Sequence, residues 1–129
     1  MTRSRLRLGF SLFVVAVCAV TTLILSTGAS AHRFAGCTPQ ALTPSVSGGR
    51  GFARAQTSGC NGISYSWQVR LSTAGGTVLA TNSGTSSADQ GFTAPGSGTV
   101  VCVGNSVHSF ITINVGGTNK SDTSGNVAC

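Results

Sequence analysis

Two histidines are the residues of this chain with the clearest metal-ligand chemistry. His32 follows Ala31 in the stretch ASAHRFAGC, and His108 lies near the other end of the chain. A histidine at a free N-terminus offers its imidazole and its α-amine to one ion. A second imidazole adds a third nitrogen, which makes a ligand set that suits Cu(II). The two residues therefore indicate a copper site, on the condition that the chain is cut after Ala31.

Residues 1–31 are typical of a cleavable secretory signal peptide. Three arginines within the first seven residues precede an apolar run at 12–25, and Ala29-Ser30-Ala31 provides the small residues that signal peptidase requires. The apolar run is shorter than the roughly 20 residues that span a bilayer, so a membrane anchor is the weaker interpretation. We expect a secreted, extracellular protein whose residues 32–129 form one domain without a membrane span.

The residue types that most catalytic chemistry needs are scarce. The chain has no glutamate, and its two aspartates, Asp89 and Asp122, lie in polar, turn-like stretches. No serine stands in a G-x-S-x-G turn, and no phosphate-binding or dinucleotide-binding glycine pattern occurs. The chain without its leader has five scattered cations and two carboxylates, a net charge of +3, with no basic cluster for nucleic acid. We expect no enzymatic activity, no nucleic-acid partner, and no cofactor unless it is copper.

Four cysteines remain once the leader is removed: Cys37, Cys60, Cys102 and Cys129. An even number in an exported chain favours two disulfides. The gaps of 23, 42 and 27 residues contain none of the C-x-x-C pairs typical of zinc sites. A minor alternative makes Cys37 a lipidated N-terminal residue. Spacing alone leaves every pairing open, including the local pairing of 37 with 60 and of 102 with 129.

Segment 63–72 alternates between apolar and polar residues without a break. Its odd-numbered residues are apolar and include Tyr65 and Trp67, the only tyrosine and tryptophan of the chain, whereas the even-numbered residues are serine, glutamine and arginine. A strand places each set on one face, while a helix would scatter both sets around its circumference. The segment is therefore predicted to be a half-buried strand.

Shorter segments follow the same logic at 51–57, 77–81, 91–93, 99–103 and 107–115. Turn residues between them predict hairpins at 74–76 and at 104–106, the second of which joins 99–103 to 107–115. Segment 82–91 and the tail 116–129 are predicted to be loops. No segment beyond the leader has helical periodicity. About seven short strands separated by Gly- and Ser-rich turns predict a single all-β antiparallel sandwich.

The order of Cys60, then Trp67 on the next strand, then Cys102 resembles the Cys…Trp…Cys order of immunoglobulin-like β-sandwiches. The resemblance covers about half of the chain beyond the leader. It implies an immunoglobulin-like topology in which Cys60 pairs with Cys102. Cys37 and Cys129, on the first and last strands, would then form the second disulfide.

His32 and His108 also resemble the histidine brace of small copper-carrier β-sandwich proteins and of copper-dependent polysaccharide monooxygenases. The alternation of 107–115 offers a simpler interpretation, because it places His108 beside Phe110 on the solvent face of a strand. Phe110 together with Phe34 would then make a surface patch, of the kind that can bind partners or sugars.

These features predict a small, disulfide-stabilised binding or interaction module that acts outside the cell or at its surface. Its expected partner is an extracellular protein or a surface glycan. Copper carriage by His32 and His108 is the first alternative. Protease inhibition is the second, although segment 82–91 has no bulky or basic residue to present to a protease. Arginine outnumbers lysine seven to one over the whole chain, which favours a bacterial gene.

Overall fold

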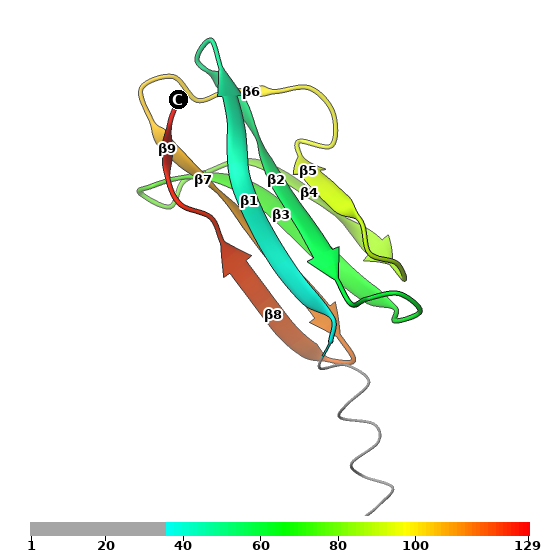
Figure 1. The fold of residues 1–129 in the computed structure, drawn as a ribbon. Helices are drawn as coiled ribbons and strands as arrows, with labels where there is room; N and C mark the ends of the chain where they lie inside the picture. Colours follow the sequence, from blue (N-terminus) through cyan, green and yellow to red (C-terminus); the bar gives the residue numbers. More distant parts are fainter. Residues whose placement is uncertain (1–35) are drawn as a thin grey trace, which may run out of the picture. The chain divides into compact units, whose positions relative to one another are not determined.

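A computed structural model describes residues 36–129, which form two antiparallel β-sheets packed together (Figure 1). Residues 1–31, His32 and Phe34 lie outside the described residues, so the expected signal peptide stays a prediction. Within the described range no helix is long and apolar enough to cross a membrane. The predicted all-β sandwich is confirmed. Its strands are β1 (Thr38–Ser47), β2 (Arg50–Ser58), β3 (Tyr65–Thr73), β4 (Val78–Ser86), β5 (Gly91–Ala94), β6 (Val100–Val101), β7 (Ser106–Val115), β8 (Thr118–Thr123) and β9 (Val127–Ala128).

The first sheet has the order β1-β2-β5, and the short β6 also pairs with β2. The second sheet has the order β4-β3-β7-β8, and β9 also pairs with β7. Every pairing is antiparallel. The long strands β3 and β7 therefore lie at the centre of the second sheet, each with a strand on both sides.

The two sheets contribute side chains of different size to the core. The second sheet provides most of the bulky ones, including Leu71 of β3 and Ile111 of β7, both fully buried, while β5 of the first sheet adds Phe92. Opposite them, β2 provides Ala53 and Ala55. Small residues facing large ones let the two sheets interdigitate at the density of a protein interior. The strict alternation of buried and half-buried residues along β7 is the direct result of this packing.

The predicted hairpin between 99–103 and 107–115 is wrong. Val100 and Val101 pair with β2 in the first sheet, whereas β7 pairs with β3, β8 and β9 in the second. The amides of Cys102 and Val103 both donate to the carbonyl of Gly49, which holds this segment against the β1–β2 turn. The turn at 103–104, closed by the hydrogen bond from the Asn105 amide to the Cys102 carbonyl, therefore carries the chain from one sheet to the other.

Three further segments differ from their predictions. Segment 38–47, which contains Pro39 and Pro44, is not among the strands predicted from alternation. It forms β1 at the edge of its sheet, with a register shift between Leu42 and Ser45, and edges and bulges are the positions where a sheet tolerates proline. Segment 82–91 is not one loop, since β4 continues to Ser86. The tail 116–129 contains β8, whose six polar residues give no apolar alternation, and the two-residue strand β9.

The disulfide pairing implied by the immunoglobulin resemblance is wrong. Cys37 pairs with Cys60 and Cys102 pairs with Cys129. The first pair lies at the end of the β1–β2 hairpin, where Thr38 is opposite Ser58. The second pair joins the residue after β6 in one sheet to the residue after β9 in the other. The two loops span 23 and 27 residues, and the chain-entropy relation predicts a stabilisation of about 3.5 kcal/mol from each.

Side chains join the two sheets along both sides of the sandwich. On one side, Asp122 of β8 accepts a hydrogen bond from the amide of Ala41 of β1 at 2.8 Å. On the other side, the amide nitrogen of Asn82 of β4 donates to the carbonyl of Thr93 of β5 at 2.9 Å. These contacts hold the sandwich closed and leave the outer faces of both sheets to solvent.

Candidate functional site

The outer face of the β4-β3-β7-β8 sheet presents three rows of side chains across its four strands. Residues paired directly across antiparallel strands point to the same face, so the register of the sheet defines each row. The first row is Thr85, Ser66, Asn114 and Asn119; the second is Ser83, Gln68, Thr112 and Ser121; the third is Thr81, Arg70, Phe110 and Thr123. Ten of these twelve residues are hydroxyl or amide residues, so the face is polar and almost uncharged.

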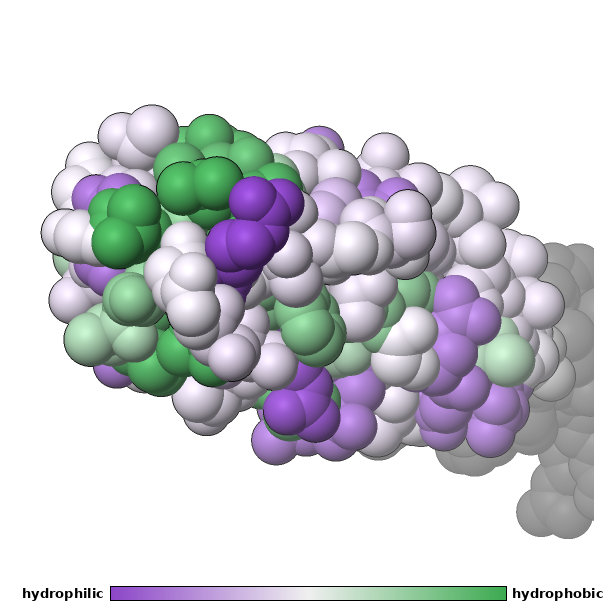
Figure 2. All heavy atoms as spheres, turned by 90° about the horizontal axis from the view of Figure 1, so that it is seen from above, coloured by the Kyte–Doolittle hydropathy of each residue, from purple (hydrophilic) through white to green (hydrophobic). Residues whose placement is uncertain are grey.

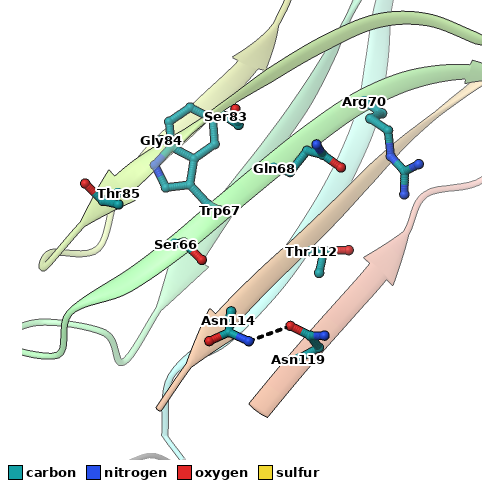
Figure 3. A pocket seen from close by; sticks show the side chains of 10 residues that line it. All are labelled: Ser66, Trp67, Gln68, Arg70, Ser83, Gly84, Thr85, Thr112, Asn114 and Asn119. Atoms are coloured by element: carbon teal, nitrogen blue, oxygen red, sulfur yellow. Dashed lines mark hydrogen bonds between the residues drawn. The ribbon is translucent and has the colours of Figure 1, made fainter. Parts of the chain in front are cut away.

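A hollow of about 620 Å³ lies over this face and is open to solvent (Figure 3). It is lined by Ser66, Trp67, Gln68, Arg70, Ser83, Gly84, Thr85, Thr112, Asn114 and Asn119. All four long strands of the sheet contribute to it. The rows and the hollow together are called the outer-face site below.

Arg70 and Phe110 lie opposite each other at one end of the outer-face site. The guanidinium carbon of Arg70 is 4.5 Å from the centre of the Phe110 ring. A cation in this position is attracted by the face of the ring. This attraction also holds the flexible arginine side chain in place. The Nε atom of Arg70 is buried and has no hydrogen-bond partner. Among the described residues, Arg70 has no carboxylate partner either.

Both aspartates lie elsewhere and bind backbone amides. Asp89 accepts hydrogen bonds from the amides of Gly59 and Cys60, at 3.1 and 2.6 Å, and from the side chain of Asn61. Asp122 accepts one from the amide of Ala41, at the edge of the sandwich. Neither carboxylate lines the hollow, so Arg70 gives the outer-face site an uncompensated positive charge.

The opposite end of the outer-face site is built from amides. Asn114 donates to Asn119 at 2.7 Å across the β7–β8 pair, and its own side-chain oxygen accepts from the amide of Gly117 at 3.2 Å (Figure 3). These bonds fix the orientation of Asn114. Gln68 is exposed, and Figure 3 shows its side chain between Arg70 and the asparagine pair. Amide side chains both donate and accept, so this end can bind hydroxyl groups.

Trp67 lies beneath the site, on the inner face of β3 as the alternation predicts. Its ring is 4.3 Å from that of Phe92 of β5, with 34° between the ring planes. The indole also extends across Gly84 on the neighbouring strand, where a Cβ atom would come within 2.9 Å of it. The Nε1 atom is buried without a hydrogen-bond partner. Trp67 therefore connects the edge of the hollow to the core.

The predicted copper and aromatic sites are only partly described. His108 is half-buried on the outer face, as expected, and its Nδ1 atom lies 3.1 Å from the side-chain oxygen of Asn126. Within residues 36–129 no group of three or more His, Cys, Asp or Glu side chains could hold a metal ion. Phe110 does not present an open ring, because Arg70 covers it. Since His32 and Phe34 lie outside the described residues, the brace and the patch remain predictions.

Apolar surface is found away from the hollow. Three valines are the large hydrophobic residues most exposed in the described chain: Val78 at 45%, Val101 at 58% and Val103 at 65%. None of them lines the hollow. Figure 2 shows the strongest apolar colour gathered toward one end of the sandwich, with mostly pale or polar surface elsewhere. Val78 lies on β4 of the same sheet, opposite Ser72, whereas Val101 belongs to β6 of the other sheet.

Sequence reasoning did not assign a ligand-binding role to Arg70, Gln68, Asn114 or Asn119. The alternation of 63–72 does indicate that Arg70 and Gln68 face outward, because both occupy its polar positions. However, the sequence does not show which residues of β3, β7 and β8 pair with one another. Only this pairing register brings the side chains of the site together. No protein-family model matches the chain, and no curated protein matches its sequence.

Proposed function

We propose that the protein is a small secreted binding module without enzymatic activity, which recognises its ligand through the outer-face site. The observation that carries the proposal is an open hollow lined by hydroxyl and amide side chains, with one arginine held on an aromatic ring and paired with no carboxylate. Binding sites combine a concave surface with a few well-placed polar groups, and this surface has both.

The chemistry of the remaining residues supports a binding role over catalysis. All four cysteines of the described chain are in disulfides, so none is available as a nucleophile. Both aspartates accept hydrogen bonds from backbone amides, which assigns them a structural role. The disulfides are also compatible with an oxidising compartment outside the cytosol.

The order of the strands supports the proposed relation to immunoglobulin-like sandwiches. Constant-type domains place strands A, B, D and E in one sheet and C, F and G in the other, and variable-type domains add strands after C to the second sheet. Here β1, β2 and β5 share one sheet with the short β6. The other sheet has the order β4-β3-β7-β8, so its β4 matches a strand added after C and not strand D. The relation is therefore proposed on topology and no longer on the positions of the cysteines.

The proposed binding role is tested with purified cell-wall polysaccharides and matrix proteins, each incubated with the secreted protein and sedimented. The double variant Gln68→Ala, Asn114→Ala removes two amides of the outer-face site. Its matched control is Gln56→Ala, an exposed glutamine on β2 in the other sheet. We expect at least one polymer to retain the wild-type protein and the control but not the double variant. Equal retention of all three proteins, or of none, would contradict the proposal.

Secretion and the copper alternative need measurements on the processed protein. The intact mass of the exported chain should equal that of residues 32–129 less four protons, because two disulfides form. A mass that retains residues 1–31 contradicts cleavage after Ala31. Copper titration of the same material then tests the alternative, since one bound ion that is lost in His32→Ala would favour a carrier.

A further inference from the structure

We propose that the ligand of the outer-face site is an acidic polysaccharide, whose uronate carboxylate binds Arg70 while its hydroxyls bind the neighbouring amide and hydroxyl rows. This inference rests on the proposed function and names the class of ligand. It is argued from the charge of the site, from the types of its side chains, and from the order of its rows.

The charge of the site selects an anion. The described residues carry four cations, Arg50, Arg54, Arg70 and Lys120, against two carboxylates. Both carboxylates are bonded to backbone amides away from the hollow, so no acid opposes Arg70 there. A guanidinium offers a planar fork of donors that matches a carboxylate through two parallel hydrogen bonds. Because Phe110 already holds the guanidinium, less side-chain freedom is lost when the anion binds.

The types of the remaining side chains favour a hydroxylated polymer as the ligand rather than another protein. The core of a protein–protein interface is typically apolar and aromatic. Within the outer-face site Arg70 covers Phe110 and the ring of Trp67 packs on Phe92, while none of the exposed valines lines the hollow. Serine, threonine, asparagine and glutamine instead provide donors and acceptors that are interspersed over the face, which is the pattern that vicinal hydroxyls can match.

The order of the rows gives the ligand a direction. The third row holds the cation, the second holds Gln68 and Thr112, and the first holds the Asn114–Asn119 pair. A polymer that runs along the strands would therefore place one carboxylate at Arg70 and the hydroxyls of the next sugar units over the amides. Figure 3 shows these side chains on the same side of the sheet.

The test uses polygalacturonate, its fully methyl-esterified form, and poly-L-glutamate as probes in calorimetric titrations of the secreted protein. Esterification removes the charge and keeps the hydroxyls, while polyglutamate keeps the carboxylate and lacks the hydroxyls. The variant Arg70→Gln is compared with Arg54→Gln, an exposed arginine on the outer face of the first sheet. Both variants remove one positive charge, so a difference between them reports position and not net charge.

We expect polygalacturonate to bind and the other two probes to have dissociation constants at least tenfold higher. The ester loses the charged hydrogen bonds to Arg70, and polyglutamate loses the contacts of the sugar hydroxyls. Arg70→Gln should weaken binding about tenfold or more, and Arg54→Gln should change it less than about twofold. Arg70→Lys should recover only part of the loss, because lysine keeps the charge without the planar fork. Matching urea-unfolding curves for all variants would show that the loss is not a loss of folding.

Four results would overturn the inference. Equal binding of polygalacturonate and its ester would overturn the carboxylate at Arg70, although the proposed function would stand if the Gln68, Asn114 double variant still lost binding. Equal binding of polyglutamate would overturn the polysaccharide class. Equal losses in Arg70→Gln and Arg54→Gln would overturn the location. Absence of polygalacturonate binding would overturn the ligand class, while the proposed function would fail only if its own sedimentation test also failed.

Discussion

The guanidinium of Arg70 lies over the ring of Phe110, 4.5 Å from its centre, and the two residues are direct partners on β3 and β7. Cross-strand pairs on an exposed face normally act in sheet stability alone. This pair also holds a cation at a fixed point beside a polar hollow, with no carboxylate nearby to neutralise it. For this reason we propose that the guanidinium of Arg70, held by Phe110, binds the anionic group of the ligand.

Removing the ring should weaken ligand binding without unfolding the protein. Phe110→Leu keeps an apolar side chain but ends the cation–π contact, which contributes about 0.5–1 kcal/mol at an exposed site. We expect a two- to fivefold higher dissociation constant for polygalacturonate, roughly the conversion of that energy. Phe52→Leu is the matched control, because Phe52 is half-buried on β2 of the first sheet. If calorimetry shows that both variants lose the same affinity for polygalacturonate, the Phe110 ring affects binding only through the stability of the fold and not through its contact with Arg70.

The disulfide pairing has an unambiguous signature in a tryptic digest of the unreduced protein. Cleavage after Arg33, Arg50, Arg54, Arg70 and Lys120 places each cysteine in a different peptide. We expect mass spectrometry to find peptide 34–50 linked to 55–70, and 71–120 linked to 121–129, as the structure requires. A link between 55–70 and 71–120 would instead support the pairing typical of immunoglobulin domains.

Tyr65 should stabilise the fold through its hydroxyl group. That hydroxyl donates to the carbonyl of Ala88 at 2.6 Å and lies 2.9 Å from the hydroxyl of Thr57, so it connects β3 to β2 and to the segment after β4. Tyr65→Phe keeps the buried ring but removes the hydrogen bonds to the buried Thr57 hydroxyl and to the carbonyl of the exposed Ala88, at a cost of about 0.5–1.5 kcal/mol for each bond. We expect the melting temperature to fall by roughly 4 °C or more, as is typical for a domain of this size.

A second variant, Thr57→Val, removes the contact between Thr57 and Tyr65 and also the hydrogen bond that the Gln90 amide donates to the Thr57 hydroxyl. It should lower the melting temperature as well. A Tyr65→Phe protein that melts at the wild-type temperature would show that the hydroxyl contributes nothing to stability.

Gly84 should be needed for the position of Trp67. A Cβ atom at Gly84 would lie 2.9 Å from the indole, so Gly84→Ala must displace the ring from its contact with Phe92. Overpacking of this kind costs about 1–3 kcal/mol. Because Trp67 is the only tryptophan, we expect a red-shifted fluorescence maximum together with lower stability.

Gly75→Ala is the control for Gly84→Ala, since the nearest atom to a Cβ at Gly75 is 3.8 Å away. The emission of Gly75→Ala should match that of the wild type. If Gly84→Ala also leaves the emission unchanged, the indole does not lie across this glycine.

The predictability of the fold differs between its central and its edge strands. Strand β3 has an uninterrupted apolar alternation, and that of β7 is interrupted only by the buried Ser109. Each strand buries one face against the core, and both were predicted from this pattern. Strand β1 contains Pro39 and Pro44, which its edge position and bulge accommodate, and β8 is polar throughout. Local patterns therefore identify strands whose own side chains form the core, and they miss strands that are stabilised mainly by a neighbour.

The disulfides and the site depend on contacts that a linear pattern does not contain. Cys102 follows a two-residue strand that pairs with β2, so it lies beside the C-terminus and not beside Cys60. In the same way, the alternation of 63–72 predicted that its even-numbered polar residues, Gln68 and Arg70 among them, face outward. The register of β3 with β7 then determines that Thr112 and Phe110 stand beside them.

The most direct test of the outer-face site is an amide chemical-shift titration of the ¹⁵N-labelled secreted protein with short polygalacturonate oligomers. We predict that the largest shifts occur at Gln68, Arg70 and Thr112 and extend to Asn114 and Asn119, while Arg54 and Gln56 on the opposite sheet remain unchanged. Shifts confined to β1 and β2, or no shifts at saturating oligomer, would contradict the assignment of this face as the binding site.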